Sequence, residues 1–232
     1  MNADRFEWLV TNRRLFMSRP DQLGDSLEGT TPGGHVEWWR REAKNAGSEE
    51  QRQIIEHNRA FLARMALGFR NHYYVSCWHM NRHENYAMWR CYTSQPDAVS
   101  IRTTYATLRE SLPNYVEMGI VRYIDYATER LPTMNMFEYI MHKDTYYGFE
   151  CEARAVAFPP VGAEHFRENH YELEATPGVL VYAPTVNVLR LIHGVVLHPE
   201  AAPDYEQEII KICAAHGLPR PERSRRTIEP VF

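Results

Sequence analysis

The chain has 232 residues, of which 44% are hydrophobic and 24% are charged. This composition is close to the average for globular proteins and excludes disordered, collagen-like and coiled-coil classes. The formal net charge is −4 and the pI is about 6.3, so bulk electrostatics do not indicate a protein that binds nucleic acid or a membrane surface.

Cysteine usage and the lack of targeting signals predict a cytoplasmic protein. The first residues are charged where a signal peptide needs an apolar run. The longest uncharged run, residues 175–189, contains two prolines and is shorter than the ~20 apolar residues of a membrane-spanning helix. We therefore expect no membrane segment. The four cysteines are far apart and form no CxxC pair, as is typical of a reducing compartment: Cys77, Cys91, Cys151 and Cys213.

Periodicity, caps and turn residues predict alternating helices and strands. Ser48 and Gln51 form a capping-box signature, and apolar residues follow at helical spacing as far as Phe69. In chain order, we predict a helix over 4–11, a strand over 14–19, a polar loop over 21–34, a short helix around 38–39, the helix after Ser48, a strand over 73–78, a helix over 84–92, a strand over 99–103, a helix over 105–112, a strand over 119–126, a helix over 134–142, an extended segment over 149–158, strands over 178–182 and 194–198, and a last helix from Pro203 to a Gly217 cap.

These elements predict an α+β fold. Several connections are too short for regular βαβ crossovers. We expect a single domain over residues 1–219, with helices packed around a mixed, mostly antiparallel sheet that contains both 99–103 and 119–126. The basic segment 220–232 lacks apolar periodicity and is interpreted as a solvated tail, with a nucleic-acid contact as the alternative.

The first candidate site lies in the segment 149–156. Alternation places Glu150, Glu152 and Arg154 on one face and small residues on the other. Two carboxylates about 7 Å apart beside a guanidinium could raise the pKa of one carboxyl or anchor an anionic ligand. The alternative is a salt-bridge ladder on a solvent-facing strand.

The second candidate site lies at the junction of the strand 73–78 and the helix after it. Glu84 is a candidate acid or base, and the alternative is a cap in which Asn81 is the N-cap and Glu84 is at N3. We expect Trp78 and Trp89 to pack in the core rather than to form a platform for a ligand. A zinc site is disfavoured because the ligand order matches no common zinc module, so we predict no metal; its potential ligands are Cys77, His79, His83 and Cys91.

The third candidate site is the polar loop after Arg19. It contains Asp25 and Glu28, and the alternative role is a simple cap with Asp25 as N-cap and Glu28 at N3. The sequence contains no Gly-x-Ser-x-Gly elbow, Walker loop or Gly-x-Gly-x-x-Gly loop, which argues against three large enzyme classes.

Together these motifs resemble an uncharacterised bacterial family, a domain of unknown function found in soluble bacterial and phage-related proteins. The resemblance covers residues 14–200, and it implies a fold group and a possible setting in phage defence, but no reaction. Proline and phenylalanine of the family's Asp-Pro-Phe-Glu-Gly loop are replaced here by Ser26 and Leu27. Asp97-Ala98 stands where the family has a glycine before the Ile-Arg strand. Asn85 stands where the family has a serine after the glutamate. The matching segments are Leu15–Arg19, Asp25–Gly29, Ser76-Cys77-Trp78, Asn81, Glu84, Met88-Trp89, Val99–Thr103, Lys143, Glu150-x-Glu152-x-Arg154 and Val195–Pro199.

A pattern-level similarity also connects the chain with ADP-ribosyltransferase-like domains, which use a strand-borne Glu-x-Glu to act on NAD. This similarity implies that Glu152 stabilises an oxocarbenium-like ribose, that Arg19 or Arg102 binds the pyrophosphate, and that Trp78 stacks on a ring. In such enzymes the Glu-x-Glu usually lies nearer the end of the chain.

Two main hypotheses follow. The first is an enzyme that acts on a nucleotide, a nucleotide cofactor such as NAD, or nucleic acid, with all candidates converging on one site. The second is a non-catalytic sensor or protein-binding domain whose charged residues form a structural buried network. A zinc-held module is a third, less favoured hypothesis. The acid or base candidates are Asp25, Glu28, Glu84, Glu150 and Glu152, and the phosphate-neutralising candidates are Arg19, Arg102, Lys143 and Arg154.

Overall fold

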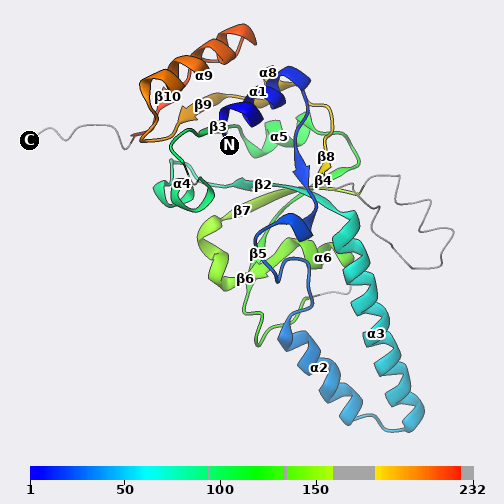
Figure 1. Cartoon of the computed structure of the whole chain (residues 1–232). Coiled ribbons are helices and arrows are strands. Elements are labelled where there is room, and N and C mark those ends of the chain that lie inside the picture. Colours follow the sequence, from blue (N-terminus) through cyan, green and yellow to red (C-terminus); the bar gives the residue numbers. More distant parts are fainter. Residues whose placement is uncertain (94, 133–134, 159–180, 226–232) are drawn as a thin grey trace, which may run out of the picture. The chain divides into compact units, whose positions relative to one another are not determined.

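The computed structural model describes residues 1–93, 95–132, 135–158 and 181–225, and confirms the α+β class (Figure 1). Sequence analysis expected one domain, whereas the contacts group the chain into two compact units. Unit 1 contains Met1–Phe16, Asn81–Asn114 and Ala183–Phe232, and unit 2 contains Met17–Met80 and Tyr115–Tyr182. Each unit is described by itself.

Unit 2 is built on a five-stranded antiparallel sheet with the order β4-β7-β2-β1-β8. The predicted strand over 73–78 is confirmed as β2, which occupies the middle of the sheet. The elements of unit 2 are α2 (Gly33–Lys44), α3 (Glu49–His72) and α6 (Met136–Met141), the 3-10 turns η1 (Pro20–Gln22) and η2 (Thr145–Glu150), and the strands β1 (Met17–Ser18), β2 (Tyr74–His79), β4 (Val116–Ile120), β5 (Arg122–Ile124), β6 (His142–Asp144), β7 (Glu152–Ala157) and β8 (Val181–Tyr182).

Strand β7 is buried along its whole length. Its alternation places Ala153, Ala155 and Ala157 on one face and Glu152, Arg154 and Val156 on the other. Val156 packs with Tyr73 and Ile140 in one apolar cluster. The alternative of a solvent-facing salt-bridge ladder is therefore wrong, because the charged face is covered by protein.

The predicted strand over 119–126 divides into two strands that belong to different sheets. β4 pairs with β7 as far as Ile120, and β5 then pairs in parallel with β6. The segment 149–158 also divides, because Glu150 ends the turn η2 and Cys151 has a left-handed φ of 42° before β7 begins. Alternation alone gave no sign of either break.

Helices α2 and α3 form a hairpin that projects from the sheet (Figure 1). Ser48 caps α3 as predicted, with its Oγ accepting a hydrogen bond from the Gln51 backbone N–H at 3.1 Å. The Gln51 side chain instead accepts from the Gly47 N–H at 2.8 Å. A Cβ at Gly34 would overlap backbone atoms of Thr128, so glycine allows the start of α2 to pack closely against that turn.

Unit 1 contains a separate three-stranded sheet with the order β10-β9-β3. The expectation that 99–103 and 119–126 share a sheet is wrong, because β3 pairs with β9. The predicted cap at Gly217 is confirmed by its φ of 67° after the last helix. The elements of unit 1 are α1 (Ala3–Asn12), α4 (Tyr86–Tyr92), α5 (Tyr105–Ser111), α8 (Val188–Leu191), α9 (Pro203–Ala215), β3 (Val99–Arg102), β9 (Gly194–Leu197) and β10 (Glu222–Arg223).

Three predicted segments extend beyond the described residues. Outside them lie residue 134 of the predicted helix, residues 178–180 of the predicted strand and residues 226–232 of the predicted tail. The first residues of the expected tail form β10, which pairs in parallel with β9. This part of the segment 220–232 is therefore incorporated in a sheet.

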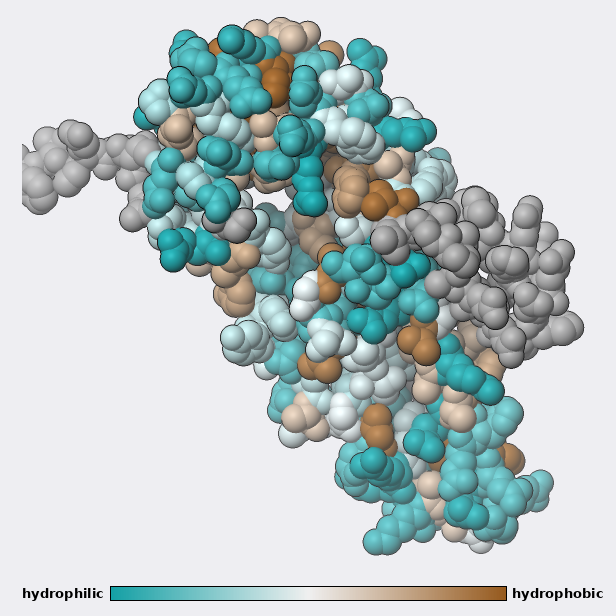
Figure 2. All heavy atoms as spheres, viewed as in Figure 1, coloured by the Kyte–Doolittle hydropathy of each residue, from teal (hydrophilic) through white to brown (hydrophobic). Residues whose placement is uncertain are grey.

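Hydrophobic side chains on the face seen in Figure 2 are scattered among polar ones. Ile54 and Leu67 on α3 are among the exposed examples. Isolated exposed apolar residues are normal for globular proteins. Within the described ranges, no helix has both the length and the apolar character needed to cross a bilayer.

Candidate functional site

Five charged side chains form a buried ion network in unit 2. Each is at most 6% exposed, and Arg154 is fully buried. They come from the loop before α2, from β6, from η2 and from β7, so residues far apart in the chain meet at one place. All five were candidates from the sequence. The structure brings them together: Glu28, Lys143, Glu150, Glu152 and Arg154.

Every N–H group of the Arg154 guanidinium has a partner. Nε and Nη2 donate to the two oxygens of Glu152 at 2.6 and 3.1 Å. Nη1 and Nη2 donate to the two oxygens of Glu28, the second at 3.0 Å, and Nη1 also donates to the Ile140 carbonyl at 2.5 Å. A guanidinium has five N–H donors, and all five are used. Arg154 therefore positions two carboxylates and has no donor left for a phosphate.

Lys143 connects the third carboxylate to this arrangement. Its Nζ donates to Glu150 Oε2 at 2.5 Å and lies 3.6 Å from Glu152 and 3.9 Å from Glu28. Burial alone would lower the pKa of the ammonium, but the hydrogen bond to Glu150 and the charges of the other carboxylates outweigh it and raise the pKa. Lys143 is therefore a cation at neutral pH.

Glu152 is ionised for the same reason. Burial tends to raise the pKa of its carboxyl, but the charge and hydrogen bonds of Arg154 outweigh this effect and lower the pKa. An ionised carboxylate cannot act as a general acid, but it can stabilise positive charge. The network holds three carboxylates and two cations, so its formal charge is −1.

The edge of the network includes residues that sequence analysis did not assign to it. The exposed Cys77 lies opposite Arg154 in the β2–β7 register, and its thiol hydrogen-bonds to Glu152. Protein atoms around the thiol desolvate it and raise its pKa. The Tyr123 hydroxyl accepts a hydrogen bond from the Glu152 N–H at 2.9 Å, and the Tyr147 ring lies 4.5 Å from Lys143 Nζ.

His79 also lies at this edge, opposite Glu152 in the register. Its Nδ1 is 2.5 Å from the Glu150 carbonyl oxygen, and its buried Nε2 has no hydrogen-bond partner within the described residues. Alternation within 73–79 places Cys77 and His79 on one strand face. This shared strand face was the sequence signal that could have placed Cys77 and His79 in one site. The alternation does not show that the face lies beside the ion network.

The loop that carries Glu28 is ordered by its own backbone. Asp25 Oδ1 accepts a hydrogen bond from the Leu27 N–H at 2.8 Å, which stabilises the turn. Gly29 has a φ of +70°, a conformation that favours glycine. Asp25 therefore orders a turn, but no helix begins there, so the expected N-cap with Glu28 at N3 is wrong. Glu28 instead reaches Arg154.

Arg19 and Trp78 lie in unit 2 but outside the ion network. Arg19 pairs with Asp21. Trp78 is on the opposite sheet face, beside Ala153 in the register, and its Nε1 donates to Ser76 Oγ at 3.1 Å.

The remaining candidates belong to unit 1. Glu84 accepts hydrogen bonds from Trp89 Nε1 at 2.7 Å and from the Arg225 N–H at 2.8 Å. Asn85, not Asn81, caps α4, so the expected cap is wrong. Trp89 packs in an apolar cluster, as its core alternative predicted. The exposed Arg102 pairs with Glu222.

Among the described residues, no group of three or more histidine, cysteine, aspartate or glutamate side chains is placed to hold a metal ion. Comparisons with protein-family models, curated proteins and solved structures find no match for this chain. The ion network is therefore interpreted from its own geometry.

Proposed function

We propose that the protein is an enzyme that acts on a nucleotide or nucleotide cofactor, with NAD as the first candidate. One observation supports this proposal: the buried ion network contains one more carboxylate than cation. An unbalanced buried negative charge is costly unless a proton or a positive group compensates it. A substrate that develops positive charge at its reacting carbon provides this compensation in the transition state.

Ribosyl transfer fits this requirement. The bond between the ribosyl carbon and the base nitrogen breaks, and its electron pair leaves with the base. A water oxygen forms the new bond to the ribosyl carbon, and the water releases one proton to solvent. Glu152 stabilises the positive ribosyl carbon, while Arg154 and Glu28 hold Glu152 in place. Lys143 positions Glu150.

The proposal also includes membership of the uncharacterised bacterial family whose motifs the chain resembles. It further includes a role in phage defence. The departure in the order of the Glu-x-Glu motif makes the choice of substrate an experimental question. Purified protein is therefore incubated with NAD, and released nicotinamide is quantified by chromatography. ATP and a single-stranded oligonucleotide serve as parallel substrates.

Glu152→Gln is the decisive variant, because the amide keeps the shape of the side chain and removes its charge. We expect release of nicotinamide by the wild type and a rate at least about 100-fold lower in Glu152→Gln, the size of effect found when one transition-state electrostatic partner is removed. Arg40→Gln, which changes an exposed pair with Glu37, is the matched control and should retain full activity. Equal rates in the wild type and in folded Glu152→Gln would overturn the proposal.

A non-catalytic binding domain is the second candidate function. The complete pairing of the Arg154 guanidinium favours it, because a saturated group serves structure as well as it serves a site. This candidate predicts no turnover of any nucleotide by the wild type and a large loss of stability in Glu152→Gln. The turnover assay distinguishes the two candidates, because release of nicotinamide by the wild type is expected of the enzyme alone.

A further inference from the structure

We infer that Arg19 and Arg70 form a binding subsite for a phosphate or pyrophosphate group. The inference rests on the proposed function for the nucleotide to which that group belongs, but the subsite can be tested with the inorganic anion alone. Arg19 was a phosphate candidate from the sequence, whereas Arg70 was not identified. Both residues belong to unit 2.

Arg19 is held in one orientation. It follows β1 and is 9% exposed, and its Nε and Nη2 donate to the two oxygens of Asp21, both at 2.6 Å. Gln22 Nε2 donates to the same carboxylate at 3.1 Å. The Asp21 carboxylate thus receives three donors, and Arg19 Nη1 donates to no partner among the described residues.

Arg70 has no ion-pair partner in the described part of the chain. It lies in the last turn of α3, and its Nε is buried without a hydrogen-bond partner. A Cβ on Gly29 would lie 3.1 Å from Arg70 Cγ, so the glycine loop packs directly against the arginine stem. This contact restricts the arginine stem beside the loop.

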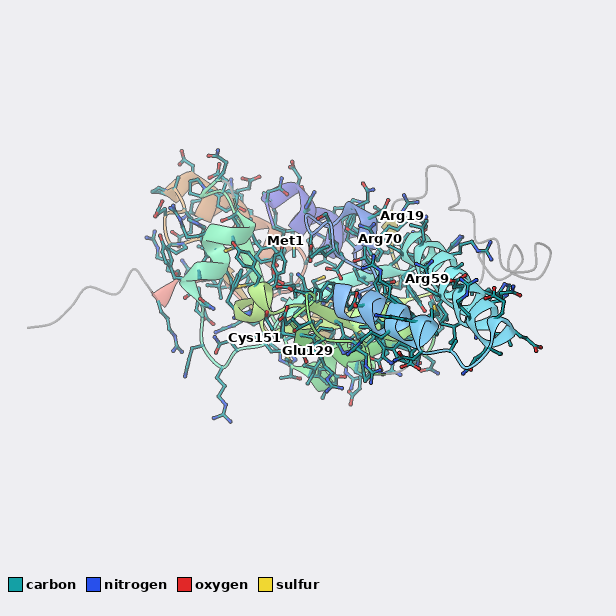
Figure 3. All side chains as sticks on the ribbon, turned by 90° about the horizontal axis from the view of Figure 1, so that it is seen from below. Met1, Arg19, Arg59, Arg70, Glu129 and Cys151 are labelled. Atoms are coloured by element: carbon teal, nitrogen blue, oxygen red, sulfur yellow. The ribbon has the colours of Figure 1, made fainter. Side chains whose placement is uncertain are left out.

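The two arginines share one neighbourhood. The 3-10 turn η1, which contains Asp21, packs against α3, and the charges of both arginines act on the Asp21 carboxyl. Figure 3 labels Arg19 and Arg70 next to each other, where the segment after β1 meets the end of α3. Two guanidinium groups and one carboxylate give a formal charge of +1.

A phosphate oxyanion matches this arrangement. Guanidinium groups offer planar pairs of N–H donors that suit phosphate oxygens, and two of them can hold both ends of a pyrophosphate. A cation in the last turn of a helix also offsets the negative end of the helix dipole. The experiment must therefore separate anion binding from this structural role.

Titration calorimetry of the full chain with inorganic pyrophosphate tests the subsite. We expect saturable binding that weakens as salt is added and is about 10-fold weaker or more in Arg70→Gln, the loss expected for one charge-assisted hydrogen-bond partner. Arg70→Lys keeps the cation at the helix end and should bind with intermediate affinity. Arg64→Gln, which removes an exposed arginine of the same helix, should bind like the wild type.

Three outcomes would overturn the inference: no pyrophosphate binding by the wild type, unchanged binding by Arg70→Gln, or an equal loss in Arg64→Gln. Circular dichroism of each variant identifies misfolding, and Arg70→Lys keeps the test usable if Arg70→Gln does not fold. Pyrophosphate has neither ribose nor base. Binding of pyrophosphate without cleavage of NAD would therefore reject the proposed function and leave the subsite intact.

Discussion

Replacing Arg154 by methionine tests how the ion network contributes to stability. Methionine replaces the aliphatic stem of arginine with an unbranched apolar chain and supplies none of the five hydrogen bonds that Arg154 donates. Glu28 and Glu152, whose side chains are 0% and 4% exposed, are then left buried without their principal partner. Breaking a buried ion pair from one side typically costs about 3–5 kcal/mol.

Lys143 moderates this cost but does not remove it, because its Nζ lies 3.6 and 3.9 Å from the two carboxylates. We therefore expect Arg154→Met to lose about 3–5 kcal/mol of unfolding free energy in urea at neutral pH, followed by circular dichroism. Arg40→Met, which breaks an exposed pair, should lose at most about 1 kcal/mol. Similar losses in the two variants would refute the reasoning.

Three further predictions concern single side chains. The pKa of Glu152 is lowered in the folded protein, so its contribution to stability is complete above the ordinary carboxyl pKa of about 4.3 and is lost as pH falls through the folded-state value. Urea midpoints measured between pH 7 and pH 3 should therefore fall more steeply for the wild type than for Glu152→Gln. Parallel curves would contradict this prediction. Gly34→Ala should cost about 3 kcal/mol in urea unfolding, because its Cβ overlaps the backbone at Thr128, whereas Gly24→Ala, with nothing within 4 Å of the added atom, should not. Cys77 should react with iodoacetamide at pH 8 more slowly than the equally exposed Cys91 and Cys151, because desolvation raises the pKa of its thiol; mass spectrometry of timed samples checks the order, and first modification at Cys77 would show it to be wrong.

Local features were predictable where the signal is local. The cap at Ser48, the strand beginning near Tyr73 and the left-handed cap at Gly217 all depend on a few neighbouring residues, and all are confirmed. Sheet membership depends on partners elsewhere in the chain. The strand over 99–103 was therefore assigned to the wrong sheet, because its pairing with β9 leaves no trace in its own residues.

The candidate site shows the same limit. Sequence patterns made candidates of Glu28, Glu150, Glu152 and Arg154, and the motif resemblance added Lys143. Their pairing could not be predicted, because Glu28 and Arg154 are separated by 126 positions. Arg70 gave no motif signal, since an arginine in the last turn of a helix is common in its own right.

The division of the chain into two units has a consequence for protein synthesis. Unit 1 draws its first helix from the start of the chain and its β9 strand from residues beyond 183, and the chain passes between the units four times. On the ribosome, α1 is therefore made long before α9, the helix that it contacts, which begins at Pro203. Neither unit can be obtained by simple truncation, so separate expression would require joining segments in a new order.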